Sequence, residues 1–163
     1  NKIDYFISHS WMDDGKIKFS SIKHFSEEYK KKHNRYPSFW LDKVCINQAE
    51  PGDAIAVLPI NIGACKKLLL LLSKSYIKRL WCIWELFTLF TFCNKEIALE
   101  RIEVIYIDSR DDCIHALTTF NIDCAHCFDP NEEYKLRQII HDIGIKRLYE
   151  CVSELVNYLN DLK

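Results

Sequence analysis

Apolar runs alternate with amphipathic segments along the chain, and this order predicts an α/β fold. Short, β-prone runs lie at residues 3–8, 38–42, 67–73, 102–107 and, more weakly, 124–128. The run at 67–73 is apolar without alternation, which is typical of a central parallel strand covered on both faces. Between these runs we predict helices at residues 16–32, 54–64, 75–93, 111–119, 132–142 and 145–162.

Five such alternations favour a flavodoxin-like three-layer sandwich, in which helices cover both faces of a five-stranded parallel sheet. We predict the strand order 2-1-3-4-5 and one domain over residues 1–163. In that order the winding reverses between strands one and three, and ligands bind where the carboxyl ends of those two strands meet.

Composition narrows the class of protein. Of the 163 residues, 48% are hydrophobic and 28% charged, so the chain can bury a core. With a net charge of -1, the chain shows no sign of the positive surface that a nucleic-acid binder needs. The longest apolar stretch, residues 80–93, is too short to insert through a bilayer. The chain begins without Met at the edge of a strand, so we expect a domain excised from a longer protein.

Cysteine usage indicates a reducing compartment. The eight cysteines are irregularly spaced, and several lie inside apolar runs, where a free thiol behaves as a small hydrophobe. We therefore expect a cytoplasmic protein. Cys124 and Cys127 flank His126, but on a strand they would point to opposite faces, and the spacing matches no zinc pattern. We predict no metal site.

Candidate chemistry gathers at the predicted switch point. The segments that follow strands one and three should be neighbours in space. The polar and aromatic residues after strand one are His9, Ser10, Trp11, Asp13 and Asp14. Those after strand three are Ser75, Tyr76, Arg79, Trp81 and Glu85. No phosphate-binding glycine loop, no nucleophile elbow and no phosphoacceptor aspartate at the end of strand three are present.

Glu85 stands out because its helix is apolar nearly all the way round. Trp81 lies one turn earlier on the same face. A carboxylate in this position either looks into a cleft, where poor solvation would raise its pKa, or has a structural role. In the structural interpretation it pairs with Lys78 or Arg79, or reaches water at the helix edge.

Three segments resemble the Toll/interleukin receptor (TIR) domain family. Residues 4–10, Asp-Tyr-Phe-Ile-Ser-His-Ser, resemble the first signature box of TIR domains. Residues 39–42, followed by a polar loop at 43–53, resemble their second strand and BB loop. Residues 73–76 and 79–86 are similar to the stretch that leads into their third major helix. The resemblance is dense over residues 4–89, just over half of the chain.

The resemblance implies a flavodoxin-like fold and one of two functions. Some TIR domains cleave the nicotinamide–ribose bond of NAD⁺ with one glutamate, often within W-x-x-x-E, a spacing that Trp81 and Glu85 match. It implies that Glu85 is catalytic and that NAD⁺ is a substrate, with no permanently bound cofactor. The implied substrate-contacting residues are Ser8, His9, Ser10, Trp11, Asp42, Lys43, Tyr76 and Trp81, with residues 42–52 as a movable lid.

The alternatives remain open at this point. Other TIR domains are adaptors that work by association with further TIR domains, and in that case the apolar helix at residues 80–92 would serve packing and protein contacts. A more distant alternative is a nucleoside ribosyltransferase of similar architecture. Under both leading interpretations we expect homotypic self-association, a signalling or immune role, and no nucleic-acid or direct membrane partner.

Overall fold

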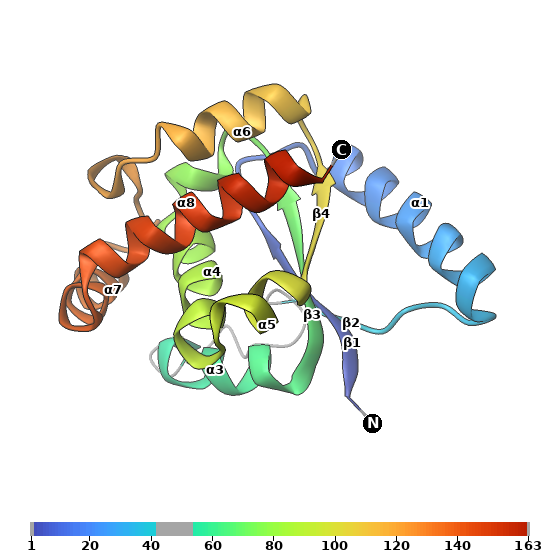
Figure 1. Cartoon of the computed structure of the whole chain (residues 1–163), viewed down its shortest axis with the longest axis horizontal. Helices are drawn as coiled ribbons and strands as arrows, with labels where there is room; N and C mark the ends of the chain where they lie inside the picture. The colour runs from blue at the N-terminus through green and yellow to red at the C-terminus, as the bar shows by residue number, and fades with distance from the viewer. Residues whose placement is uncertain (1, 42–53, 163) are drawn as a thin grey trace.

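A computed structural model describes residues 2–41 and 54–162 of the chain (Figure 1). Its strands are β1 (Ile3–His9), β2 (Phe39–Trp40), β3 (Cys65–Leu72) and β4 (Ile102–Tyr106). Its α-helices are α1 (Gly15–His33), α3 (Ala54–Ala64), α4 (Leu80–Phe92), α5 (Lys95–Glu100), α6 (Arg110–Thr118), α7 (Pro130–Ile143) and α8 (Ile145–Asp161), and the short 3₁₀ helices are η2 (Tyr76–Lys78) and η3 (Ile122–Cys124).

The described strands form a parallel sheet in the order β2-β1-β3-β4. This order confirms the predicted flavodoxin-like winding, which reverses between β1 and β3. In the β1–β3 pairing, Ser8 lies beside Leu70 and His9 beside Leu71, so both strands end at the same edge of the sheet. The polar segments that follow them therefore leave the sheet side by side.

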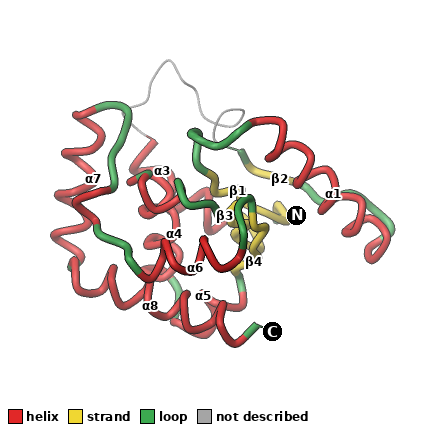
Figure 2. Tube along the Cα trace, turned by 90° about the horizontal axis from the view of Figure 1, so that it is seen from above, coloured by secondary structure: helices red, strands yellow, loops and turns green. Residues whose placement is uncertain are grey.

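Helices cover the two faces of the sheet unequally. Alternate side chains of a strand point to opposite faces. Leu68, Leu70 and Leu72 of β3 face a large core with α3, α4, α6 and α8, whereas Leu69 and Leu71 face α1. Figures 1 and 2 show α1 alone on one side of the sheet, with the other helices gathered on the opposite side. The apolar character of β3 on both faces follows from this arrangement.

Local sequence explains the bounds of α1. The side chain of Asp14 caps its first turn by accepting hydrogen bonds from the backbone N–H groups of Lys16 and Ile17. Asn34 ends the helix in the left-handed conformation, with φ of 55°. The basic residues of the last turn lie at the end of the helix where its dipole favours cations.

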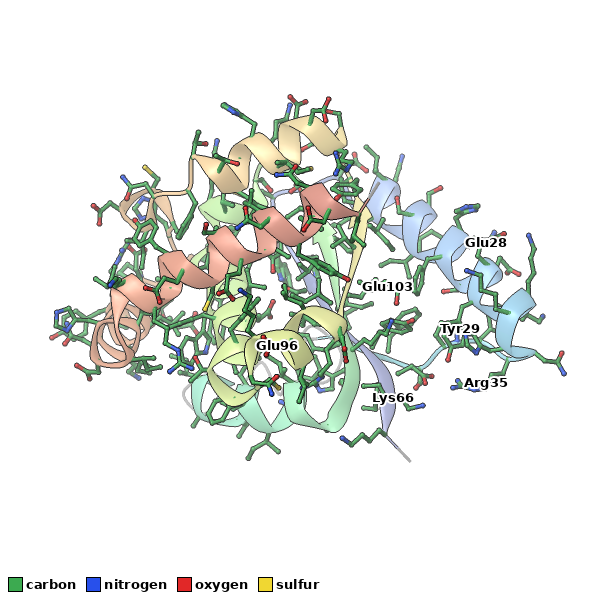
Figure 3. The ribbon with its side chains drawn as sticks, in the orientation of Figure 1. Glu28, Tyr29, Arg35, Lys66, Glu96 and Glu103 are labelled. Carbon is green, nitrogen blue, oxygen red and sulfur yellow. The ribbon has the colours of Figure 1, made fainter. Side chains whose placement is uncertain are left out.

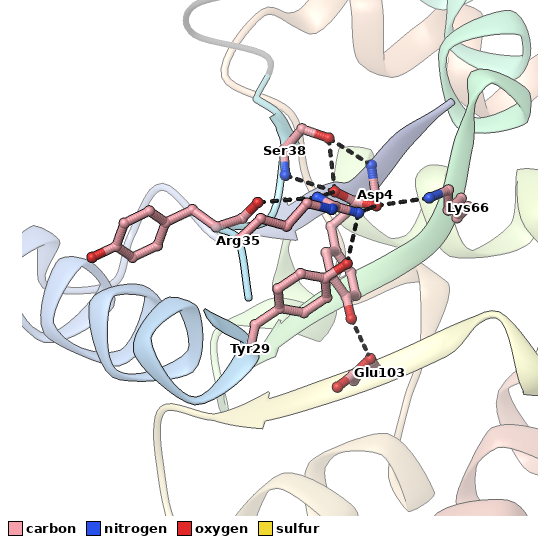
Figure 4. A network of polar contacts seen from close by, with 8 residues as sticks. Asp4, Tyr29, Arg35, Ser38, Lys66 and Glu103 are labelled. Atoms are coloured by element: carbon pink, nitrogen blue, oxygen red, sulfur yellow. Dashed lines mark hydrogen bonds and ion pairs between the residues drawn. The ribbon is translucent and has the colours of Figure 1, made fainter. Parts of the chain in front are cut away.

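An ion cluster around Asp4 joins α1, β1, β2 and β3 at the amino end of the sheet (Figures 3 and 4). Asp4 is buried, and its two oxygens accept hydrogen bonds from Arg35 at 2.7 and 2.8 Å and from Lys66 at 2.9 Å. Ser38 adds its N–H and hydroxyl, at 2.9 and 3.0 Å. This cluster lies at the opposite end of β1 from Ser8, so it supports the fold rather than the candidate site.

The structure corrects the prediction of a fifth strand at residues 124–128. The segment begins in η3, and His126 forms only an isolated bridge, with Arg79. Its backbone N–H donates to the Lys78 carbonyl at 2.9 Å, and its carbonyl accepts from the N–H of Leu80 at 3.1 Å. The segment therefore pairs with the chain entering α4 instead of with β4.

Glu133 of α7 explains this placement. Its carboxylate accepts a hydrogen bond from the N–H of Cys127 at 2.9 Å and contacts the ring of His126 at 3.1 Å, while Arg137 contacts it from one turn further on. Burial alone would raise the pKa of Glu133, but these partners outweigh burial and bring that pKa to about 2. The carboxylate holds the segment against α7. The sequence analysis had assumed that Cys124 and Cys127 lie on one strand. In the structure they do not.

Candidate functional site

The ends of β1 and β3 bring the two predicted segments together. The hydroxyls of Ser10 and Ser75 share a hydrogen bond of 2.6 Å. Asp13 accepts hydrogen bonds from the hydroxyls of Ser75 and Ser73, at 2.7 and 2.9 Å. The structure thus confirms that the chain after strand one and the chain after strand three are neighbours. Ser73 also belongs to this cluster, although the sequence analysis had considered the end of strand three only for the absence of a phosphoacceptor aspartate.

Glu85 lies in the second turn of α4 and is directed at the end of β1. Its side chain is buried, with 7% of the residue exposed, and Oε2 accepts a hydrogen bond of 2.5 Å from the hydroxyl of Ser8. The interpretation in which Glu85 reaches water at the helix edge is therefore wrong. The structure therefore buries the Glu85 carboxylate and holds it by a hydroxyl at the switch point of the sheet.

Tyr76 of η2 completes the contact between β1 and α4. It is fully buried, and its hydroxyl lies 2.6 Å from the Ser8 hydroxyl and 3.1 Å from the carbonyl of Cys82. The thiol of Cys82 in turn donates to the carbonyl of His9 at 3.2 Å. Burial raises the pKa of Tyr76 well above its ordinary value, and the charges that Cys82 and Glu85 carry when ionised act in the same direction.

His9 and Trp11 form the side of the site nearest α1. Lys18 donates to the Ser10 carbonyl at 2.8 Å, and its ammonium lies 3.1 Å from Nδ1 of His9. Because an ammonium only donates, Nδ1 accepts, and this contact assigns the proton of a neutral ring to Nε2. The ring of His9 stacks on Trp11 with centroids 6.0 Å apart, and Trp11 is about half exposed. Sequence reasoning missed Lys18, whose role depends on how α1 packs.

Trp81 lies one turn before Glu85 but contacts a different element. Its indole N–H donates to Glu132 of α7 at 3.0 Å, and the ring is half-buried. Trp81 therefore joins α4 to α7, whereas Glu85 joins α4 to β1. Nothing in the local sequence pointed to Glu132, which lies 51 positions after Trp81. Asp42, Lys43 and the predicted lid at residues 42–52 lie outside the described residues.

A separate apolar cavity of about 510 Å³ opens between α3, α4 and α7. Pro59, Trp84 and Ile139 contribute to its lining. Among the described residues, none of the side chains that the sequence assigned to substrate binding lines it. The cavity therefore lies apart from the groups gathered around Glu85.

A family model for the TIR domain matches residues 21–113, more than half of the chain. The chain therefore belongs to the TIR domain family. The matched region contains Tyr76, Trp81 and Glu85, whereas the first box at residues 4–10 precedes it. A search of curated proteins found no match. None of the helices in the described part of the chain combines the length and apolar character that a membrane-spanning segment needs.

Proposed function

We propose that this TIR domain hydrolyses NAD⁺ at the nicotinamide–ribose bond, with Glu85 as the catalytic carboxylate. One observation carries the proposal. Glu85 is the buried acid of an otherwise apolar helix, and its carboxylate meets the Ser8 hydroxyl where the winding of the sheet reverses. Crevices at this position bind ligands in open α/β sheets.

One carboxylate is enough for this reaction. Nicotinamide leaves NAD⁺ as a neutral molecule from a cationic precursor, so the leaving group needs no strong general acid, in contrast to ordinary glycosides that require two carboxyl groups. Loss of nicotinamide develops positive charge on the ribosyl centre. The fixed negative charge of Glu85 stabilises that charge, and the carboxylate can also accept hydrogen bonds from the ribose hydroxyls.

The residues around Glu85 differ in how far they are exposed, and their proposed roles differ accordingly. Trp11 and the half-buried Trp81 present ring surface on which nicotinamide or adenine can stack. His9 borders the same site. Ser8, Ser10 and Tyr76 are fully buried, so their part is to build the floor beneath the substrate. Asp42 and Lys43 keep their proposed role as substrate contacts on the lid.

The cellular setting is also part of the proposal. We place the domain in a cytoplasmic signalling protein of immune or cell-death type, with activity raised by self-association between TIR domains. An active site completed by a neighbouring domain would make specific activity rise with protein concentration. Equal specific activity over a hundredfold range of protein concentration would contradict this part of the proposal.

A non-catalytic interaction module is the second candidate. Large apolar side chains are exposed on three helices: Phe19 on α1, Ile60 on α3 and Phe92 on α4 are each 70% exposed. Such side chains suit contacts with other TIR domains. By contrast, α4 between Leu80 and Phe90 is almost wholly buried, so that stretch serves packing and not a protein contact.

The two candidates are separated by E85Q, which keeps the size of the side chain and removes its charge. NAD⁺ is incubated with concentrated protein and its products are separated by chromatography, while light scattering follows self-association. The enzyme proposal predicts that wild type releases nicotinamide and that E85Q assembles equally but releases none. Assembly by both proteins without nicotinamide release would favour the interaction module.

A further inference from the structure

Three polar groups from three elements form one buried chain. The Tyr76 hydroxyl of η2, the Ser8 hydroxyl of β1 and the Glu85 carboxylate of α4 follow one another at 2.6 and 2.5 Å. Tyr76 and Ser8 have no exposed surface. Their hydrogen-bonding capacity therefore has to be met inside the protein.

The number of protons fixes the direction of this chain. When Glu85 is ionised, its carboxylate can only accept, and Ser8, which has one hydroxyl proton, donates to it. Tyr76 must then be the donor in its contact with Ser8. The Cys82 carbonyl, at 3.1 Å, is a more distant acceptor that competes for the same phenol proton. Two hydroxyl dipoles thus align toward the carboxylate, and hydrogen bonds aligned in this way strengthen one another.

Tyr76 stays a donor because its burial raises the pKa of the phenol well above the ordinary value. Among the described residues, the titratable groups around this chain include side chains of α4, α7, β1 and α1. On α4 the Cys82 thiol and the Glu85 carboxylate both act on Tyr76, while Glu132 of α7 binds Trp81. On the β1 and α1 side, His9 contacts Lys18. Helix α3 carries no ionisable side chain among its residues.

We propose that Tyr76 is a positioning residue, which acts through the Ser8 hydroxyl to hold Glu85 ionised and in one orientation at the end of β1. Its effect on catalysis rests on the proposed NAD⁺ hydrolysis, whereas its effect on Glu85 does not. The phenol touches no substrate, because it is fully enclosed.

The test compares Y76F with Y5F. Phe keeps the ring and its packing and removes only the hydroxyl. Tyr5 is a matched control because it is a buried tyrosine whose hydroxyl also donates to a carboxylate, that of Glu103 at 2.9 Å, toward the other end of β1. Carbon-13 NMR of protein labelled at glutamate carboxyl carbons follows the titration of Glu85, whose signal is assigned by its loss in E85Q.

We expect the titration midpoint of Glu85 to rise in Y76F by about one pH unit, a tenfold weaker preference for the ionised form. Y5F should titrate as wild type at Glu85. In steady-state kinetics on NAD⁺, Y76F should lower kcat about tenfold and leave KM within about twofold, because an aligned carboxylate acts in the transition state. Y5F should leave both constants within about twofold.

The two readouts separate the two ideas. A Glu85 titration that is the same in Y76F and wild type overturns the positioning role, whatever the activity. A shifted titration in a protein that releases no nicotinamide supports the positioning role and removes the proposed function. If Y76F does not fold, S8A breaks the same chain next to the carboxylate and must show the same titration shift, and an unshifted midpoint in S8A overturns the proposal.

Discussion

Ser8 and Glu85 lie 77 positions apart in the chain, yet the hydroxyl of one meets the carboxylate of the other at 2.5 Å. The contact exists because β1 and β3 are neighbours in the sheet and α4 follows β3 back across its end. It ties the buried acid of α4 to the carboxyl end of β1, where the winding of the sheet reverses. The candidate site is therefore a direct product of the winding order of the sheet.

The ion cluster around Asp4, at the other end of β1, should contribute to the free energy of unfolding but not to catalytic activity. D4N removes the charge that Arg35 and Lys66 share, and hydrogen bonds to a charged group contribute about 1.5–3 kcal/mol. Both cations stay partly solvated in the variant, so we expect a loss of about 2 kcal/mol in the free energy of unfolding. Urea denaturation measures it. E28Q, which removes an exposed carboxylate paired with Lys31, is the control and should change little.

The difference in unfolding free energy between wild type and D4N should also depend on pH. The guanidinium of Arg35, with Ser38 and Lys66, holds the pKa of Asp4 well below the ordinary value of 3.8. A lowered folded pKa stabilises the fold above the ordinary value, and that contribution is lost as the pH falls further. The difference between wild type and D4N should be full at pH 7 and narrow below about pH 3.8. A difference that stays constant to pH 2 would show that Asp4 does not act through its charge.

Cysteine reactivity should follow burial. Burial raises the pKa of Cys113 and of Cys151 to about 11 in each case, whereas Cys124 is exposed. The thiolate is the reactive form, so among the cysteines that the structure describes, iodoacetamide at pH 8 should label Cys124 first. Cys113 and Cys151 should react only after unfolding. Peptide mass mapping over time tests this order, and early labelling of Cys113 would mean that the core around α6 opens in the native protein.

Trp81 offers a test of whether its ring or its N–H matters. If the ring stacks on the substrate, W81F should keep kcat/KM within about threefold, because a ring remains, and W81A should lose more than about tenfold. E132Q, which weakens the hydrogen bond from the indole, should behave like W81F. An equal loss in W81F and W81A would indicate that the link to α7 carries the effect, and E132Q should then share that loss.

Much of the fold could be predicted because its signals are local. The continuous apolar run of β3 and the helical spacing in α1 and α8 depend only on nearby residues, and each element was confirmed with bounds close to those predicted. Helix α5 was missed, since its six residues are too few for a periodic pattern to emerge. The segment around His126 was taken for a strand because composition cannot say which backbone a segment will pair with, and it pairs with Arg79.

The site divides in the same way. The order of the strands was enough to predict that the segments after strands one and three are neighbours, and the contact between Ser10 and Ser75 confirms it. The strand order could not show that Tyr76 is fully enclosed or that Trp81 binds Glu132, since both depend on how η2 and α7 pack. The contact of Lys18 with His9 depends likewise on the position of α1.

The most direct test of the central claim is proton NMR of NAD⁺ in the presence of concentrated protein, comparing wild type with E85Q and E96Q. Glu96 is an exposed glutamate of α5 (Figure 3), so its variant controls for the loss of one negative charge. We predict that wild type and E96Q release nicotinamide at equal rates and that E85Q, folded as judged by its unfolding transition, releases it at least about a hundredfold more slowly. Equal rates in all three proteins would contradict the role of Glu85, and no release by any of them would contradict the enzyme itself.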